Sequence, residues 1–205
     1  MQISLEQVGK KFQHEWIFRK IDYQFNLGKA YAITGPNGSG KSTLLQVISG
    51  ILPANEGNVN YIVNSKYIDI TEIFPYIDIA APYQELVEEF TLIEFLKFHF
   101  SFKSIKKGLS IEELIQILRL EKSINKIIKH FSSGMKQRLK LGLAFFSQSQ
   151  VILLDEPTSN LDEVGINWYM QNVTGILKEK LIIICSNTPA EYSFCDFNIN
   201  ILDHK

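Results

Sequence analysis

Residues Gly35 to Thr43 have the types and the order needed to bind a polyphosphate. Glycines at the bends of such a segment let the backbone curl until successive N–H groups point at one centre. Lys41 would supply a positive charge to the outer phosphates, and the Ser42 hydroxyl would be a ligand for Mg²⁺. The predicted contacts of this phosphate loop are Gly35, Asn37, Gly38, Ser39, Gly40, Lys41, Ser42 and Thr43. We therefore predict a nucleoside triphosphate site.

Two adjacent carboxylates, Asp155 and Glu156, follow the apolar run 151–154. Open α/β sheets bind ligands at the C-terminal ends of their strands, where this pair would lie. Asp155 suits a metal-holding role through water, and Glu156 could polarise the water that attacks a γ-phosphate. Taken alone, the pair is equally well explained as a solvated acidic turn. Beside a phosphate loop, phosphoryl transfer becomes the favoured interpretation, because that chemistry needs a positioned metal and a positioned water.

A turn of small residues opens a second helix between these segments. It runs from Phe131 to Arg138 and includes Ser132 and Gly134. Serine and glycine are common at the first positions of any helix, so an ordinary N-cap explains the segment equally well by itself.

Alternating apolar runs and helical patterns surround these motifs and predict an α/β fold. Apolar runs at 30–34, 151–154 and 181–184, separated by helices, indicate a mostly parallel sheet that is buried on both faces. Strand-like patterns near the N-terminus and at 21–27 indicate an antiparallel β layer beside it. Thr91 and Glu94 have the spacing of a capping box that opens a helical subdomain at about 85–130. We expect a single domain over 1–205, with that subdomain inserted.

The charge balance argues against a nucleic-acid partner. Lysine and arginine number 21, against 22 aspartates and glutamates, so no overall positive field exists to hold a phosphate backbone. The chain lacks a basic segment followed by an apolar one at its start, and it lacks about 18 consecutive apolar residues. We expect a cytoplasmic protein that does not itself insert into a membrane.

Together, the three segments closely resemble the ATP-binding subunits of ABC transporters. They are Gly35 to Thr43, Phe131 to Arg138, and Leu153 to Asp162, in this order, and the resemblance covers essentially the whole chain. It implies a P-loop fold of the ABC ATPase type with ATP and Mg²⁺ as cofactors. It also implies a second ATPase subunit, docked head to tail, and a separately encoded membrane-spanning permease.

The resemblance also implies roles for individual residues. Ser132 and Gly134 would touch the γ-phosphate that is bound on the partner subunit, and Asp162 would link the two sites across the interface. Phe12 fits the position of the aromatic residue that stacks on adenine, with Trp16 as the alternative. The catalytic residues would be Glu156, Lys41 and Asn187, and the metal ligands Ser42, Gln84 and Asp155.

Four residues depart from the family pattern. Gln84 is the candidate for the magnesium-contacting glutamine, but its distance to Thr91 is short, and an ordinary surface glutamine is the alternative. Asn187 stands at or next to the position of the usual histidine near the γ-phosphate. Asparagine can donate a hydrogen bond but cannot carry a proton as histidine can. We hypothesise that hydrolysis through Glu156 persists but is slower. Ser133 and Met135 replace the more common glycine and glutamine.

Other residues receive simpler interpretations. Phe95, Phe98 and Phe102 share one helix face, which is either the core of the helical subdomain or, in part, a surface that receives a short helix of a membrane subunit. The histidines show no ligand spacing, and we expect His99 on the exposed side of its helix. We expect the lysine cluster 103–107 to be a solvated loop.

The predicted function is ATP hydrolysis that powers transport, of the export type, through a separate permease. We expect the permease to hold this subunit at the inner face of the cell membrane. The alternative is a regulatory module whose output is ATP-dependent dimerisation with slow hydrolysis. A soluble ATPase that acts on DNA or ribosomes is disfavoured, because the chain has no long coiled-coil insertion, second cassette or basic excess.

Overall fold

Five parallel strands form the central sheet of the protein, in the order β6-β7-β8-β3-β9. The computed structural model describes all 205 residues. The strands are β3 (Ala30–Thr34), β6 (Ile77–Ala80), β7 (Val151–Asp155), β8 (Leu181–Cys185) and β9 (Phe197–Asn200). Every residue of β7 and β8 is buried, which explains why these strands are continuous apolar runs and not alternating patterns.

The predicted antiparallel layer is a second sheet with the order β2-β1-β4-β5. Its strands are β1 (Gln2–Phe12), β2 (Glu15–Asn26), β4 (Glu56–Val63) and β5 (Lys66–Ile68). The first two are longer than the sequence pattern indicates, because irregular positions in each interrupt the alternation. Gln7 and Lys20, for example, adopt positive φ angles of 52° and 53°.

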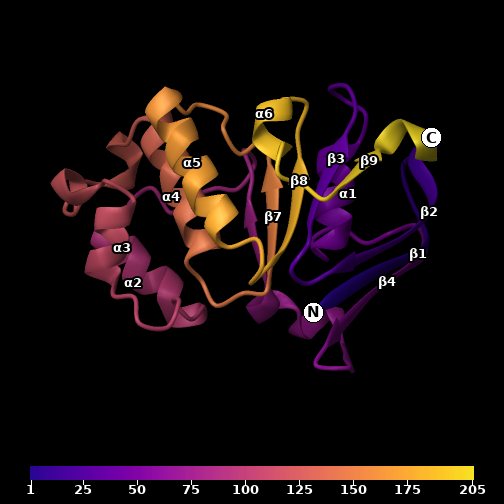
Figure 1. The fold of residues 1–205 in the computed structure, drawn as a ribbon, viewed down its shortest axis with the longest axis horizontal. Coiled ribbons are helices and arrows are strands. Elements are labelled where there is room, and N and C mark those ends of the chain that lie inside the picture. Colours follow the sequence, from indigo (N-terminus) through magenta and orange to yellow (C-terminus); the bar gives the residue numbers. More distant parts are fainter.

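Helices α4 (Ser133–Phe145) and α5 (Glu163–Gly175) cover one face of the parallel sheet, and α1 (Lys41–Ile48) lies on the opposite face, between that sheet and the antiparallel sheet (Figure 1). The other helices are α2 (Leu92–Phe102), α3 (Ile111–Ile117) and α6 (Pro189–Tyr192). Short 3₁₀ turns lie at Ile70–Glu72, Phe74–Tyr76, Glu121–Ser123, Ile128–His130 and Ile201–His204. The α/β fold predicted from the sequence is confirmed.

Alternate residues of the central strands supply two separate hydrophobic cores. Ile152 and Ile182 face a cluster of 25 buried residues that includes α4, α5 and the helical subdomain. Leu153 and Ile183 face a cluster of 22 buried residues that joins α1 to the antiparallel sheet. The sheet is therefore a rigid divider, and its C-terminal edge holds the loops between the two cores in place.

The helical subdomain begins at the predicted capping box, in which the Thr91 backbone N–H donates to Glu94 at 2.9 Å. A second capping box, formed by Ser110 and Glu113, opens α3. The expectation of a solvated lysine loop at 103–107 is wrong for Lys103. Its ammonium is buried and forms an ion pair with Asp78 of β6 at 2.7 Å, which ties the end of α2 to the central sheet. None of the helices is both long enough and apolar enough to cross a membrane.

Candidate functional site

The phosphate loop connects β3 to α1 and opens at the N-terminal end of that helix. Gly35, Gly38 and Gly40 all have positive φ angles, of 146°, 76° and 105°. A side chain at Gly40 would also place its Cβ 2.3 Å from the Cγ2 of Ile17. Only glycine fits there, and α1 begins without any side-chain cap on its free N–H groups. The first turn of α1 is thus left open to an anion.

Lys41 extends back along the loop. Its ammonium donates to the carbonyl oxygens of Gly35 at 2.8 Å and Pro36 at 3.2 Å, and only 6% of the residue is exposed. The loop, Ile17 and Glu156 line a cavity of about 230 Å³, which we call the phosphate cavity; its loop residues are Asn37, Gly38, Ser39, Gly40, Lys41, Ser42 and Thr43. The structure therefore brings Glu156 to the same space as the predicted phosphate contacts.

Asp155 is the last residue of β7 and is 3% exposed. Burial raises the pKa of its carboxyl, a hydrogen bond with the Ser42 side chain opposes that rise, and the nearby charge of Glu156 adds to it. A buried carboxylate and a serine hydroxyl in contact are a pair of oxygen ligands of the kind that Mg²⁺ prefers. The two predicted metal ligands Ser42 and Asp155 thus fit the ion.

Glu156 follows in the left-handed region, with a φ of 45°, and its N–H donates to the Cys185 carbonyl of β8 at 2.9 Å. A non-glycine residue held in that conformation is strained unless its surroundings fix it. The bond to β8 fixes it here, and the turn aims the carboxylate into the phosphate cavity.

Asn187 lies two residues beyond β8 and reaches the phosphate loop. Its side-chain amide donates to Oδ1 of Asn37 at 2.7 Å. The preceding residue, Ser186, is anchored because its N–H donates to the Ile33 carbonyl of β3 at 3.3 Å. A hydrogen-bond donor without a titratable proton therefore stands at the edge of the phosphate cavity.

Gln84 is not brought to the phosphate cavity. A turn closed by the Gln84 N–H and the Ala81 carbonyl, at 3.2 Å, follows β6. Gln84 lines a different, mainly apolar cavity, and its Oε1 is buried without a hydrogen-bond partner. The side chain of the neighbouring residue, Tyr83, faces the phosphate loop and α1 instead.

Sequence reasoning missed Tyr83. Burial raises the pKa of its hydroxyl and the charge of Asp155 raises it further, whereas a side-chain hydrogen bond with Gln46 opposes the rise. The residue as a whole is 41% exposed, and its hydroxyl lies near Gln46 of α1 and Asp155. The sequence predicts a turn near these residues but does not say which of the two adjacent side chains, Tyr83 or Gln84, faces the phosphate loop.

Phe12 ends β1 and is 48% exposed. Its ring centre lies 5.4 Å from the ammonium of Lys10, which pairs with Phe18, and Phe18 packs toward Gly40 of the phosphate loop. The alternative, Trp16, is flanked by Lys11 and by Arg19, whose charged groups lie 5.2 Å and 4.1 Å from the ring centre. Phe12 therefore has one cation beside its ring and Trp16 has two, and Phe12 is the more accessible of the two candidates.

A second polar cavity, of about 490 Å³, lies at the N-terminus of α4, and we call it the signature cavity. Ser132 caps α4 by accepting a hydrogen bond from the Met135 N–H at 3.2 Å. Asp162 caps α5 by accepting one from the Gly165 N–H at 2.8 Å. A Cβ on Gly134 would lie 3.0 Å from the Asn160 carbonyl, so the two capped helix starts are in close contact.

Three cations also line the signature cavity: Arg119, Lys122 and Arg138. Two carboxylates, Glu121 and Asp162, line it as well, and that of Asp162 already accepts from the Gly165 N–H. The helix N-terminus and the three cations favour an anion in this cavity. It shares no lining residue with the phosphate cavity. One copy of the chain thus has two separate polar cavities.

The segment after Glu156 is held by a residue that sequence reasoning also missed. Glu191 of α6 is 5% exposed and accepts hydrogen bonds from both the N–H and the hydroxyl of Thr158, the former at 3.0 Å. Its backbone carbonyl accepts a third bond from the Tyr169 hydroxyl at 2.9 Å. Gln137 of α4 donates to the Pro157 carbonyl at 2.8 Å. The strand end that carries Asp155 and Glu156 is therefore braced from two helices.

Comparison with known proteins identifies the class of this fold and site. The sequence model of the ABC transporter family matches residues 18–159. The chain belongs to that family: it is an ATP-binding subunit and an ATP hydrolase of the ABC type.

Two curated relatives illustrate the similarity. The uncharacterized ABC transporter ATP-binding protein YybJ of Bacillus subtilis is 30% identical over 97% of this chain and 92% of its own length. The lantibiotic transport ATP-binding protein SrtF of Streptococcus pyogenes is 25% identical over 90% of this chain and 79% of its own length.

Solved structures show the same fold. A putative ABC transporter ATP-binding protein from Pyrococcus furiosus superimposes with a TM-score of 0.81 at 23% identity, covering all of both chains. The ATP-binding cassette MJ0796, solved as a dimer in a post-hydrolysis state with ADP and Pi, gives a TM-score of 0.83 at 23% identity over 97% of this chain and 94% of its own.

Proposed function

We propose that this subunit hydrolyses ATP in two composite sites of a head-to-tail dimer and so powers transport through a separate membrane-spanning permease. The observation that carries the proposal is the separation of the phosphate cavity from the signature cavity. Each cavity would supply some of the groups that bind a triphosphate, and neither would supply all of them. A second copy, turned by a two-fold axis, would bring the signature cavity of one subunit over the phosphate cavity of the other.

In the complete site, Lys41 and the loop N–H groups would hold and neutralise the phosphates. Ser42 and Asp155 would hold Mg²⁺, which when bound offsets the negative charge that develops on the phosphate oxygens. Glu156 would orient the attacking water, and its strained, fixed backbone keeps the carboxylate in place. Asn187 would donate to a phosphate oxygen. The sequence assignment of Gln84 as a third metal ligand remains a prediction, and its place in the apolar cavity does not support it.

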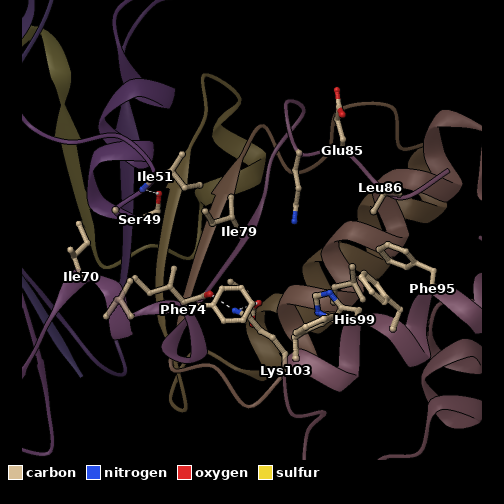
Figure 2. Close-up of a pocket in the computed structure, with 18 residues that line it drawn as sticks. Ser49, Ile51, Ile70, Phe74, Ile79, Glu85, Leu86, Phe95, His99 and Lys103 are labelled. Atoms are coloured by element: carbon tan, nitrogen blue, oxygen red, sulfur yellow. Dashed lines mark hydrogen bonds and ion pairs between the residues drawn. The ribbon is translucent and has the colours of Figure 1, made fainter. Parts of the chain in front are cut away.

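The permease would dock in that apolar cavity, which we call the docking groove. It has a volume of about 530 Å³ and lies between the central sheet and the helical subdomain. Figure 2 shows Ile51, Ile79 and Phe74 on one side, and Leu86 and Phe95 on the other. Large apolar side chains at its rim are exposed, namely Ile51 at 62%, Phe74 at 57%, Phe98 at 45% and Phe102 at 65%. An apolar helical turn of a membrane subunit suits this surface.

Phe95 is 6% exposed and belongs to the subdomain core, whereas Phe98 and Phe102 are exposed and pack edge to face on each other. The core interpretation of the phenylalanine face thus holds for Phe95, and the exposure of the other two supports the docking interpretation. Docking of this kind would hold the subunit at the inner face of the cell membrane. Export is the proposed direction, and the relative named for lantibiotic transport supports it.

The experiment uses Glu156→Gln, which keeps the shape of the side chain but removes the charge that orients water. With ATP and Mg²⁺, this variant should sediment as a dimer that holds two ATP molecules, and without ATP as a monomer. The matched control is Glu156→Gln combined with Gly134→Asp, which should bind ATP as a monomer because the added carboxylate repels the facing phosphates.

A monomer of Glu156→Gln saturated with ATP would overturn the composite-site proposal. A wild-type dimer that persists with unhydrolysed ATP would instead favour the alternative function, a regulatory module whose output is dimerisation. The Asn187–Asn37 contact motivates that alternative, because the side chain at position 187 has no proton that it could transfer near the phosphates.

A further inference from the structure

Lys140 of α4 holds the turn that follows β6. Its ammonium donates to the carbonyl oxygens of Ala81 at 3.1 Å and of Pro82 at 3.3 Å. The Ala81 carbonyl also accepts from the Gln84 N–H at 3.2 Å, which closes a β-turn with Pro82 and Tyr83 at its two central positions. Lys140 therefore contacts both the closing carbonyl of the turn and the peptide between its central residues.

The charged end of Lys140 makes no other polar contact within the subunit. None of the ion pairs of the chain includes it. Burial lowers the pKa of Lys140, and the charge of Lys136 adds to that shift. A partly buried cation without a counter-ion costs free energy unless other polar groups offset the lost hydration, and here the two carbonyl oxygens do so. The ammonium is thus committed to the turn.

The turn begins beside the end of β7. In the parallel register of β6 and β7, Ala80 lies opposite Leu154, so the next residue along β6 is level with Asp155. The Tyr83 hydroxyl lies near that carboxyl, whereas Gln84 lines the docking groove. The direction of the Tyr83 side chain depends on how the central peptide of the turn is oriented, because β-turn types differ in that orientation. The bonds from Lys140 fix it.

We propose that Lys140 is a positioning residue for ATP hydrolysis, which keeps the Tyr83 hydroxyl beside the phosphate site by holding the carbonyls of Ala81 and Pro82. This role concerns hydrolysis itself and depends on neither the proposed dimer nor the proposed permease. Arginine could take the place of lysine, since a guanidinium also donates to carbonyl oxygens. Methionine has an unbranched apolar stem but no donor, so it could fill the space without fixing the turn.

A double-mutant cycle separates this role from a merely structural one. ATP turnover at saturating ATP is measured for the wild type, Lys140→Met, Tyr83→Phe and the double variant, with Lys140→Arg as the conservative substitution. The matched control is Lys136→Met, one turn earlier on α4, because its ammonium pairs with Glu88 and not with the turn. A cooperative thermal transition shows that each variant is folded.

We expect Lys140→Met and Tyr83→Phe each to lower kcat about tenfold. The double variant should be no slower than either, because both substitutions remove the same hydroxyl from its place. Lys140→Arg should keep at least half of the wild-type rate, and Lys136→Met should match the wild type. A second measurement follows the turn without nucleotide: the fluorine NMR resonance of a fluorinated tyrosine in place of Tyr83 should move toward its solvent value in Lys140→Met and in none of the other lysine variants.

A loss of about a hundredfold in the double variant would mean that Lys140 acts independently of Tyr83, and it would overturn the proposal. Wild-type turnover of Lys140→Met or of Tyr83→Phe would overturn it too. So would equal losses in Lys140→Arg and Lys140→Met, because the stem and not the donor would then be at fault, and so would an unmoved fluorine resonance in Lys140→Met.

Discussion

Glu191→Ala tests whether the brace behind the catalytic strand end is as important as its contacts suggest. The substitution removes the carboxylate that accepts from the Thr158 N–H at 3.0 Å and from the Thr158 hydroxyl. It leaves the third bond in place, since the Tyr169 hydroxyl binds the backbone carbonyl of residue 191. Any loss can therefore be assigned to the Thr158 contacts and to the space left by the side chain.

A hydrogen bond to a charged group contributes about 1.5–3 kcal/mol, and the two bonds here share one oxygen, so we expect a loss of about 3 kcal/mol in the free energy of unfolding. For a chain of this size, that loss lowers Tm by about 6–12 °C. Hydrolysis should also slow, because Thr158 lies two residues after Glu156 and the freed segment would let that carboxylate move.

The assay is urea denaturation of the wild type, Glu191→Ala and Glu191→Gln, together with ATP turnover at a temperature where all three are folded. Glu191→Gln is the matched control because its amide oxygen can still accept from Thr158, and it should lose only about 1 kcal/mol. Equal unfolding free energies for Glu191→Ala and the wild type, within about 0.5 kcal/mol, would refute the reasoning.

Three further predictions concern the site and its surroundings. Asn187→His should raise the rate of ATP turnover, because histidine can carry a proton or a positive charge beside the γ-phosphate, and an unchanged or lower rate would count against our hypothesis. Tyr83→Phe should lower kcat about tenfold, because it removes one hydrogen bond near Asp155. Tyr67→Phe, at a residue that is 74% exposed, should leave kcat unchanged, and equal effects of the two substitutions would contradict the role of Tyr83. Burial lowers the pKa of Lys180 from 10.5 to about 8, so above pH 8 the unfolded chain binds more protons than the folded one. The free energy of unfolding, measured with urea from about pH 8 to pH 10, should therefore rise more steeply in the wild type than in Lys180→Met, and parallel curves would disprove this.

The motifs of the parallel sheet were predictable because local pattern and final environment agree there. The runs that became β7 and β8 are apolar throughout, and the sheet buries them on both faces. The neighbouring strand β6 was not predicted. Its sequence contains Asp78, whose buried charge is stabilised by two residues far along the chain, Lys103 and Ser147. The other missed strand of the parallel sheet, β9, is short and mostly exposed, so its sequence pattern is weak.

The phosphate loop, Asp155 and Glu156 lie at one place because strand ends fix them, and strand ends can be read from the sequence. The turn after β6 cannot be read in this way. It turns Tyr83 and Gln84 toward different sides, and a shift of one residue exchanges their surroundings. The surroundings of His99 and Glu191 could not be read from the sequence either. We expected His99 on the exposed side of its helix, but it lines the docking groove, and Glu191 is 5% exposed. Elements that are far away in the chain decide the burial of both side chains.

The central claim is that each complete ATP site needs the phosphate cavity of one subunit and the signature cavity of another. Mixing two inactive variants tests it most directly. Lys41→Ala damages only the first cavity, and Gly134→Asp only the second.

Either variant alone should hydrolyse almost no ATP. In an equal mixture, random pairing gives about half mixed dimers, each with one intact site of two, so about a quarter of the wild-type rate should return. A mixture as inactive as its parts, although mixed dimers form, would contradict the account.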